Sequence, residues 1–447
     1  MDMCILPGCL SGAVRAIPAK SQAHRALICA ALADGPTRIE CAGESADIAA
    51  TAACLTALGA KIKREPGGYL VHPLENNWAN TNHPPETPTP VGVGARFIAA
   101  NKHEPATLPC GESGSTFRFL LPVVCALGQS ASFLPQGRLP QRPLSPLYEE
   151  LIRHGCNLSP PGAVPFQVTG QLIPGRYELD AGVSSQFISG LLFALPLLGE
   201  DSELHLSGQV ESYPYIELTI AMLEVFGIQL EFDGAVFAIS GNQVFRSPGE
   251  LNVEGDWSNA AFWLGAGAIG TGIVTCTNLN LASRQGDRAF VDILKRFGAR
   301  VEAGGSSVTV SGGQLRGIEI DARDIPDLAP IAAVNAAAAV GITVIRNAGR
   351  LRTKESDRLA ATSAMLRSLG VDISETDDGL LIKGGAALKG GAVSSCGDHR
   401  IAMAAAIAAT VCAGPVVIQG AEAVNKSYPG FFDDLRLLGG SAQIIRT

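Results

Sequence analysis

The chain has few aromatic and few charged residues. Of 447 residues, 6% are aromatic and 17% are charged, whereas 47% are hydrophobic. This composition excludes a disordered chain. The formal net charge is −8, and no basic stripe stands out, which disfavours a nucleic-acid-binding protein. The 51 glycines indicate frequent turns, so we expect large cores built from small residues.

Motifs for metals, redox chemistry and dinucleotides are missing. The 11 cysteines are scattered from Cys4 to Cys412 without a C-x-x-C pair, which leaves zinc ribbons and thioredoxin-like sites without support. Reduced, mostly buried thiols indicate a cytoplasmic protein. GAGAIG at 265–270 matches G-x-G-x-x-G but ends a predicted helix and precedes a strand, the reverse of a dinucleotide site. We therefore expect no metal and no cofactor.

One uncharged run exceeds the length needed to cross a membrane. It extends from Trp257 to Ser283 and is interrupted by several glycines and by Asn278 and Asn280. This pattern predicts a buried helix followed by a buried strand rather than a membrane span. The N-terminal residues also lack the pattern of a signal peptide, so no membrane partner is expected.

Two interleaved series of glycines reveal a six-fold repeat. Ala/Leu-rich blocks end at a first series of glycines, and L-x-x-x-G sequences end at a second, mostly with a period of about 71 residues. Glycine after a helix adopts the left-handed conformation easily, so both series predict helix ends. The first series is Gly35, Gly128, Gly199, Gly270, Gly341 and Gly414; the second is Gly59, Gly155, Gly227, Gly298, Gly370 and Gly439.

Strand-like segments follow the second series, at 60–71, 228–240, 299–311 and 371–383. Each unit is therefore predicted to hold two helices and several short strands. The first unit is about 25 residues longer than the others, and its excess lies in 72–106. This segment contains NNWANTNHPPETPTP, which predicts a surface loop.

Cations gather at the predicted helix N-termini. Free backbone N–H groups give a helix N-terminus a positive end, where an added cation is unfavourable unless an anion binds. A single Ser, Thr or Asp there is usually an ordinary cap, and a single Arg is usually in a surface ion pair. The joint pattern, however, predicts a cleft for one or two small polyanions. The eight cations are Lys20, Arg25, Arg118, Arg142, Lys354, Arg358, Arg400 and Lys426.

A set of motifs in fixed order carries a specific resemblance. The chain contains IPAKSQAHRALICAALADG, CGESGSTFRFLLP, QRPL, VSSQF, ESYPYIEL, DIPDLAP, RTKESDR, GDHRIAMAAA and NKSYPGF. From about residue 15 to 436 it resembles the EPSP synthase family of enolpyruvyl transferases. The resemblance implies an α/β fold of two domains, each with three βαβαββ-like units around buried parallel helices. The domains would be 20–252 and 1–19 plus 253–447, with a hinge near 19–20 and 253–256.

The resemblance also implies a reaction, in which phosphoenolpyruvate and shikimate 3-phosphate give an enolpyruvyl ether and phosphate. Asp327 would accept the hydroxyl proton and Glu355 would donate a proton, with Lys20 and Lys426 also catalytic. The residues implied for shikimate 3-phosphate are Lys20, Ser21, Arg25, Ser184, Ser185, Gln186, Ser212, Tyr215, Asp327 and Lys354. Those implied for phosphoenolpyruvate are Lys20, Gly114, Arg142, Gln186, Arg358, Arg400 and Lys426. A cytoplasmic monomer is expected.

Two carboxylates among many cations favour an enzyme over a passive phosphate-binding protein, because the reaction needs an acid and a base beside one centre. Three alternatives stay open: a UDP-N-acetylglucosamine enolpyruvyl transferase, a phosphate-binding protein and an RNA 3′-phosphate-processing protein. No cysteine lies in the loop pattern expected of the first, and the acidic charge disfavours the last. The chain departs from the family pattern at Arg350, where Asn is common, and at Glu112.

Overall fold

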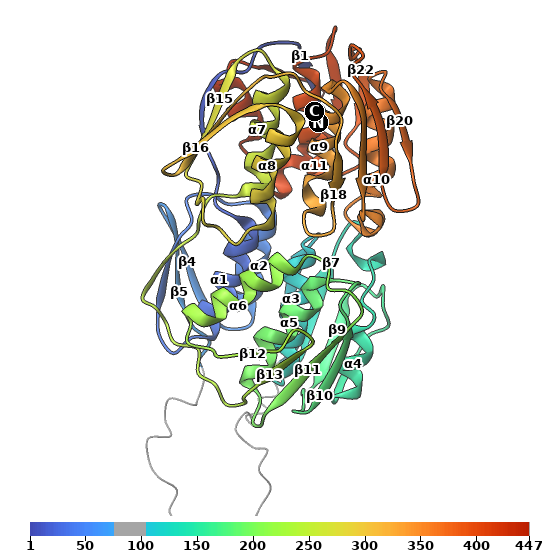
Figure 1. Ribbon diagram of the computed structural model, residues 1–447. Coiled ribbons are helices and arrows are strands. Elements are labelled where there is room, and N and C mark those ends of the chain that lie inside the picture. Colours follow the sequence, from blue (N-terminus) through green and yellow to red (C-terminus); the bar gives the residue numbers. More distant parts are fainter. Residues whose placement is uncertain (76–103, 447) are drawn as a thin grey trace, which may run out of the picture. The chain divides into compact units, whose positions relative to one another are not determined.

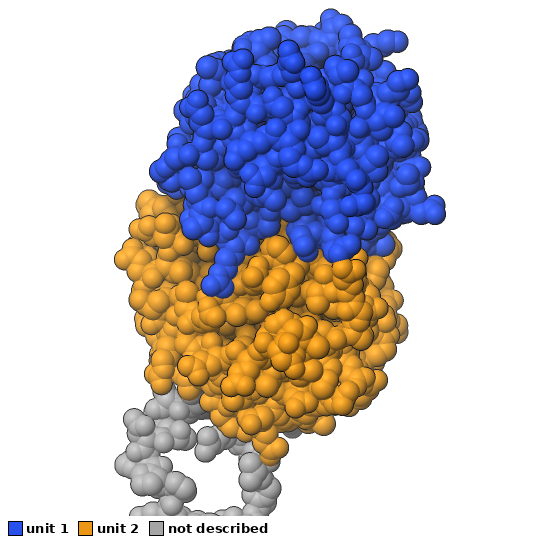
Figure 2. Space-filling model, in the orientation of Figure 1, with its two compact units in different colours: residues 1–20, 43–46, 254–447 blue, residues 21–42, 47–253 orange. Residues whose placement is uncertain are grey.

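The structure is a computed structural model that describes residues 1–75 and 104–446. Most of the loop predicted at 72–106 therefore lies outside the described residues. The chain divides into two compact units, coloured separately in Figure 2. Unit 1 comprises residues 1–20, 43–46 and 254–447, and unit 2 comprises residues 21–42 and 47–253.

Three four-stranded sheets build unit 2. In each sheet, in the strand order given below, the first and second strands pair in parallel and the two remaining pairs are antiparallel. The first sheet is β14 (Glu250–Asn252), β3 (Thr37–Glu40), β5 (Gly68–His72) and β4 (Lys61–Glu65). The second is β6 (Ala106–Gly111), β7 (Ala131–Pro135), β9 (Phe166–Gly170) and β8 (Cys156–Leu158). The third is β10 (Arg176–Asp180), β11 (Ser202–Ser207), β13 (Val236–Ile239) and β12 (Glu231–Phe232).

Unit 1 repeats this sheet pattern three times. Its first sheet is β2 (Gly12–Arg15), β15 (Ile273–Thr277), β17 (Ser307–Ser311) and β16 (Arg300–Gly304). The second is β18 (Glu319–Asp321), β19 (Gly341–Arg346), β21 (Leu380–Gly384) and β20 (Asp372–Glu375). The third is β22 (Gly391–Ser394), β23 (Val416–Gln419), β1 (Asp2–Leu6) and β24 (Ser441–Arg446).

Strands from distant parts of the chain complete three of these sheets. β14 pairs with β3, β2 pairs with β15, and β1 lies between β23 and β24. With these exchanges, the described sheets and their helices follow the β-α-β-α-β-β order, which confirms the predicted six-unit α/β fold.

One helix of each repeat is buried along almost its whole length. In α11, every residue from His399 to Ala409 is buried, and the run of alanines allows its neighbours to approach closely. Within unit 1, α7, α9 and α11 pack against one another (Figure 1). The buried helices are α1 (Lys20–Leu32), α3 (Gly114–Ala126), α5 (Ser185–Ala194), α7 (Trp257–Ile269), α9 (Ala329–Ala338) and α11 (His399–Ala409).

The other helix of each repeat has an exposed side. This set is α2 (Ala46–Ala57), α4 (Leu147–Arg153), α6 (Tyr213–Val225), α8 (Phe290–Phe297), α10 (Arg358–Ser368) and α12 (Phe431–Leu437). The 3₁₀ turns in the described part of the chain are η2 (Leu139–Gln141), η3 (Leu195–Leu197), η4 (Gly286–Ala289), η5 (Pro326–Leu328), η6 (Gly349–Thr353) and η7 (Ala421–Lys426).

The two glycine series end their helices differently. All six glycines of the second series have positive φ, from 77° at Gly227 to 114° at Gly59, which confirms the predicted left-handed helix ends. In the first series, Gly128 and Gly341 have positive φ, but Gly270 caps α7 in an extended conformation with φ −84°. The left-handed prediction was therefore wrong at Gly270 and also at Gly35, Gly199 and Gly414, none of which has a positive φ. After α7 the chain enters β15 through a bend at 270–272 and needs no left-handed residue.

The uncharged run from 257 to 283 forms α7 followed by β15, as predicted. GAGAIG lies at the end of α7, which confirms that it is not in a strand-to-helix turn. Across residues 1–75 and 104–446, no helix is long and apolar enough to cross a bilayer. All 11 cysteines are free thiols, and eight of them are buried.

Candidate active site

In unit 1, the predicted polar residues lie at the beginnings of three helices. Asp327 is in η5, directly before α9. Arg358 is the first residue of α10, and Arg400 is the second residue of α11. Lys426 ends η7, which packs against α11. The fold therefore brings together residues from four separate motifs of the sequence.

Arg358 is the centre of this cluster. Its guanidinium is 2% exposed and binds three carboxylates. Nε donates to Asp398 Oδ2, Nη1 to Asp327 Oδ1 and Nη2 to Glu355 Oε2, each at 2.7 Å. Burial alone would lower the pKa of Arg358, but the three carboxylates outweigh burial and raise it. Arg358 is thus permanently charged and fixed in orientation.

Asp327 is held between two guanidinium groups. Its Oδ1 accepts from Arg358, and its Oδ2 accepts from Arg400 Nη2 at 2.7 Å. Burial favours a raised pKa for Asp327, yet the charges of Arg400, Arg358 and Lys354 hold the pKa well below its usual range. Without substrates, Asp327 is therefore an ionised carboxylate and a weak base.

Glu355 completes the carboxylate group on the other side of Arg358. Its Oε2 accepts from Arg358, and its Oε1 lies 3.9 Å from Lys426 Nζ. The side chains of Glu355 and Lys426 are 12% and 10% exposed. A carboxyl group beside a lysine, partly open to solvent, can exchange a proton during a reaction.

The N-cap of α11 supports this arrangement from behind. Asp398 is fully buried and accepts hydrogen bonds from Ser356 Oγ at 3.0 Å and from the Arg400 backbone N at 2.9 Å. The adjacent His399 is 1% exposed. Burial, together with Lys20, Arg400 and Arg358, lowers the pKa of His399 well below its usual value, so the imidazole is neutral.

Lys20 joins unit 1 through its backbone. The Lys20 N–H donates to Asp256 Oδ2 at 3.0 Å, while Asp256 Oδ1 caps α7 by accepting from the Asn259 N–H at 2.8 Å. Burial raises the pKa of Asp256, and its hydrogen bonds and the charges of Arg400 and Lys20 oppose that rise. Asp256 therefore binds the backbone of both Lys20 and the first turn of α7.

In unit 2, a second polar cluster lies where α3 and α5 begin. Gln186 donates from Nε2 to Ser115 Oγ at 3.0 Å and accepts at Oε1 from Arg118 Nη1 at 2.8 Å. Arg118 also donates to the Pro143 carbonyl oxygen at 2.8 Å, next to Arg142. A Cβ added to Gly114 would lie 2.8 Å from Arg142 Nη1, so the guanidinium rests directly on this glycine.

The predicted phosphoshikimate residue Arg25 joins α1 to α6. It is 2% exposed, and its three nitrogens donate to Thr219 Oγ1, the Ser21 carbonyl and the Tyr215 carbonyl at 2.8, 2.6 and 2.7 Å. These bonds place Ser21 and Tyr215 beside each other. Contact of Arg25 with a ligand stays a prediction.

The predicted serines of unit 2 mark two further helix starts. Ser184 caps α5 by accepting from the Gln186 N–H at 3.3 Å, and Ser185 begins that helix. Ser212 precedes α6 with a left-handed φ of 56°. A Ser189–Thr219 hydrogen bond of 2.7 Å links α5 to α6.

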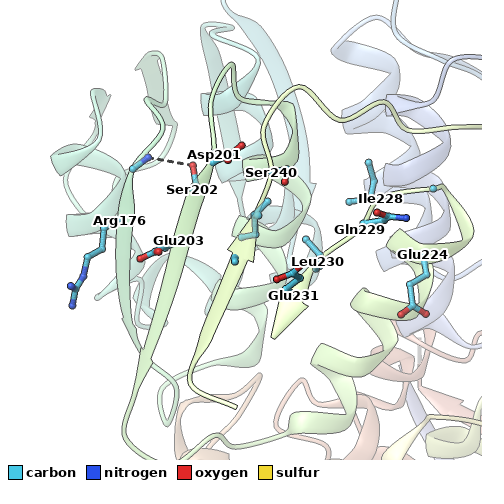
Figure 3. A pocket seen from close by; sticks show the side chains of 14 residues that line it. Arg176, Asp201, Ser202, Glu203, Glu224, Ile228, Gln229, Leu230, Glu231 and Ser240 are labelled. Atoms are coloured by element: carbon cyan, nitrogen blue, oxygen red, sulfur yellow. Dashed lines mark hydrogen bonds between the residues drawn. The ribbon is translucent and has the colours of Figure 1, made fainter. Parts of the chain in front are cut away.

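A separate hollow in unit 2 contains none of the predicted site residues. It measures about 930 Å³ and lies between the β10–β13 sheet and the end of α6 (Figure 3). Its lining carries four acidic residues, Asp201, Glu203, Glu224 and Glu231, against one basic residue, Arg176. This charge does not suit a polyanion, so the hollow is not a candidate for the phosphate site.

Sequence reasoning missed three carboxylates of unit 1 as site residues: Asp256, Asp287 and Asp398. Two of them are helix N-caps, which is the ordinary role of Asp before a helix. Their proximity to Arg400 and Arg358 depends on the tertiary fold. Within the described residues, no group of His, Cys, Asp and Glu side chains is arranged to hold a metal ion. Glu112 rests against Gly137, which has φ 56°.

Comparison with known proteins places this geometry in a family. A model described as EPSP synthase (3-phosphoshikimate 1-carboxyvinyltransferase) matches residues 6–435. Proteins named 3-phosphoshikimate 1-carboxyvinyltransferase are 41% identical in Clostridium kluyveri and 42% identical in Clostridium acetobutylicum. Each match covers 98% of this chain and 97% of the relative.

Solved structures agree with the sequence matches. An EPSP synthase from Acinetobacter baumannii is similar with a TM-score of 0.77 and 25% identity, covering 99% of this chain and all of that one. The enolpyruvyl transferase NikO from Streptomyces tendae shares the fold with a TM-score of 0.73 and 20% identity, covering 99% and 98%. With a family model that spans almost its whole length and relatives about 41% identical, this chain belongs to the EPSP synthase family.

Proposed function

We propose that this protein transfers the enolpyruvyl group of phosphoenolpyruvate to the 5-hydroxyl of shikimate 3-phosphate and releases phosphate. The observation that carries the proposal is the attachment of Asp327 and Glu355 to one buried guanidinium, that of Arg358. A base and an acid are thereby fixed around a cation that can bind an anionic substrate. Membership of the EPSP synthase family supports the same reaction.

The ion pairs suggest how substrate binding activates the base. Arg358 and Arg400 bind Asp327 when no substrate is present. A phosphate or carboxylate of phosphoenolpyruvate that contacts these arginines competes with Asp327 for their hydrogen bonds. The pKa of Asp327 then rises, and its carboxylate becomes a stronger base at the moment when the hydroxyl is in place.

The addition step needs both carboxyl groups. Asp327 accepts the proton of the 5-hydroxyl while that oxygen forms a bond to the central carbon of phosphoenolpyruvate. Glu355 donates a proton to the methylene carbon, which becomes a methyl group. The product is a tetrahedral intermediate that still carries the phosphate.

The elimination step reverses the proton movement at the methyl group. The carbon–oxygen bond to phosphate breaks, the methyl group loses a proton, and the enol double bond forms again. Cations stabilise the negative charge on the departing phosphate, which is the role proposed for Lys20, Arg142, Arg358, Arg400 and Lys426. Atoms and charges balance without an oxidant or a reductant.

The binding assignments complete the proposal. Gln186 is positioned by Ser115 and Arg118, so its amide is proposed to contact both substrates. Ser21, Arg25, Ser184, Ser185, Ser212, Tyr215 and Lys354 are proposed to hold shikimate 3-phosphate, and Gly114 to adjoin phosphoenolpyruvate. We also propose that the protein acts as a cytoplasmic monomer without an added cofactor. Sedimentation at assay concentration, an assay in chelator and subcellular fractionation check these points.

A phosphate-release assay with two alternative acceptors tests the reaction. We expect release from phosphoenolpyruvate with shikimate 3-phosphate and none with UDP-N-acetylglucosamine. Asp327→Asn and Glu355→Gln should each lower kcat by roughly 10²- to 10⁴-fold, the usual contribution of a general acid or base. The exposed Asp433, changed to Asn, is the matched control and should keep the wild-type rate. Near-normal turnover by either site variant would refute its assigned role.

A further inference from the structure

The proposed mechanism leaves one buried carboxyl of unit 1 without a role. Asp287 lies in η4 and is 2% exposed. Its Oδ2 accepts a hydrogen bond from Ser258 Oγ, at the beginning of α7. η4, η5 and α11 all pack against α7, so the segments that carry Asp287, Asp327 and Arg400 adjoin the same helix.

The loop before Asp287 is fixed to the chain at the start of α7. Gln285 Oε1 accepts from the Trp257 N–H at 3.0 Å, and Gln285 Nε2 donates to the Gly255 carbonyl and to Glu254 Oε1, both at 2.9 Å. Ser283 also donates to Glu254. These bonds fix the loop before Asp287 beside the start of α7, where the Asp287 side chain is buried.

The charged groups with the largest influence on the Asp287 carboxyl are Asp327 from η5, Arg400 from α11 and Asp256 at the N-cap of α7. Burial and the negative charge of Asp327 raise the pKa of Asp287 to about 7, while Arg400 and the Ser258 hydrogen bond act in the opposite direction. The other charged residues of η4 and α8, namely Arg288, Asp292, Lys295 and Arg296, are exposed.

We propose that Asp287 is a positioning residue that decides how fully Arg400 is available to Asp327 and to an incoming anion. As a neutral acid, Asp287 leaves the Arg400 charge to these two partners. As a carboxylate, it competes for Arg400 and adds negative charge beside the anion site, which weakens binding of phosphoenolpyruvate. The inference rests on the proposed function, because it assigns Arg400 to phosphoenolpyruvate.

The test measures KM for phosphoenolpyruvate between about pH 6 and pH 8 in the full-length protein and in Asp287→Asn. The neutral amide of Asn can still accept from Ser258 but cannot ionise. Between these two pH values, the factor by which KM rises should be roughly three to ten times larger for the wild type than for Asp287→Asn. A tenfold difference corresponds to about one pKa unit of interaction between Asp287 and the bound anion. Substrate phosphates also titrate near pH 6, but their effect is common to both proteins and cancels in the comparison.

Infrared spectroscopy provides a readout that does not depend on turnover. The wild type should lose the carbonyl stretch of a protonated carboxylic acid as pH rises through about 7, and Asp287→Asn should lack this change. Ser258→Ala removes a hydrogen bond that lowers the pKa of Asp287, so it should move both the infrared midpoint and the rise in KM to higher pH. A residue with a merely structural role would give no such shift.

Asp434→Asn is the matched control. Asp434 is another carboxyl of unit 1, and partial burial raises its pKa. It accepts a hydrogen bond from Tyr428, which is not a predicted site residue. This variant should keep the wild-type rise in KM.

Coincident KM profiles for the wild type and Asp287→Asn, or identical infrared titrations, would overturn the inference. If Asp287→Asn does not fold, an unshifted Ser258→Ala profile would overturn it equally. Absence of phosphate release by the wild type would instead refute the proposed function.

Discussion

At the scale of single residues, the carboxylates of unit 1 occupy the arginines that the substrates are proposed to use. Arg358 binds Asp327, Glu355 and Asp398, and Arg400 binds Asp327. Buried charges that lacked such partners would be costly in the ligand-free protein. The same contacts that preserve the cluster without substrate therefore keep Asp327, the proposed base, weakly basic until an anion binds the arginines.

Gly114 provides a test of how closely a side chain can approach Arg142. In Gly114→Ala the new Cβ would lie 2.8 Å from Arg142 Nη1, so the guanidinium must move. If Arg142 binds phosphoenolpyruvate as proposed, its displacement should raise KM for phosphoenolpyruvate by roughly tenfold and change kcat little, since one lost charge-assisted hydrogen bond contributes about 1.5–3 kcal/mol at most. Steady-state kinetics measures both constants.

The control for this variant is Gly111, which has φ 55° but open space around its added Cβ. Gly111→Ala should affect stability more than KM. An unchanged KM in Gly114→Ala would show that Arg142 does not contact phosphoenolpyruvate.

His399 predicts a pH dependence of stability. Its folded pKa is lowered well below 6.5 by burial and nearby cations, so the unfolded chain binds a proton as pH falls below 6.5 while the folded chain does not. Stability is therefore full above about pH 6.5 and lost below it, by about 1.4 kcal/mol per pH unit. His399→Gln should lack this slope.

Denaturant unfolding at about pH 7.5 and about pH 5.5 checks the prediction, with the exposed His72→Gln as control. An equal loss of stability in His399→Gln and the wild type would contradict it.

The sequence was sufficient to identify site residues whose charge is unusual at their position in a predicted helix. Arg358 and Arg400 were identifiable because cations are unfavourable at helix starts, and the structure places both at the first turn of a helix. Lys426 was also predicted at a helix start, but this was wrong, because the residue ends η7 and α12 begins only at Phe431. Asp398 and Asp256 were not, because Asp is an ordinary N-cap and nothing local distinguishes a cap that also holds an arginine or Lys20. Asp287 lies far from Asp327 in the sequence, so its proximity could not be predicted.

At the scale of elements, the second glycine series ends its helices in the left-handed conformation. Gly298 has φ 104°, and a Cβ there would lie 2.5 Å from the Gln314 carbonyl oxygen. Gly298→Ala should therefore destabilise unit 1 by roughly 2–4 kcal/mol, from backbone strain together with the displaced carbonyl. The control is Gly304→Ala in β16, where an added Cβ meets nothing within 4 Å.

Thermal or denaturant unfolding distinguishes the two alanine variants. If Gly298→Ala and Gly304→Ala were equally stable, the left-handed conformation at Gly298 would not require glycine.

The repeat period predicted the elements but not all of their partners. Helix ends and hairpins follow from local signals, such as the second glycine series and the strand-like segments after it, which form the β4–β5, β12–β13, β16–β17 and β20–β21 hairpins. β14 is only three residues long, and its partner β3 lies far away in the sequence. Pairing between such segments leaves no periodic signal. The family resemblance grouped residues 1–19 with 253–447, but the partner strands of β1, β2 and β14 came from the structure.

At the scale of the whole molecule, the proposed substrate residues come from both units. Gln186 and Arg142 belong to unit 2, and Arg358 and Lys426 belong to unit 1. If both groups act on one pair of substrates, binding must couple the two units, and a reduced radius of gyration is the expected sign. Small-angle scattering with phosphate-free buffer, with each substrate analogue alone and with both together tests this expectation. Identical dimensions in all samples would argue against coupling.

The placement of β1 has a consequence for how the protein is made. Met3 pairs with Ile418 on one side and Ile444 on the other, so β1 is synthesised long before both of its partner strands. Unit 2 can close its sheets once β14 has been synthesised, whereas the third sheet of unit 1 must wait for β24. Meanwhile β1 presents hydrogen-bonding edges to other chains, which makes β1 a segment that a chaperone would shield.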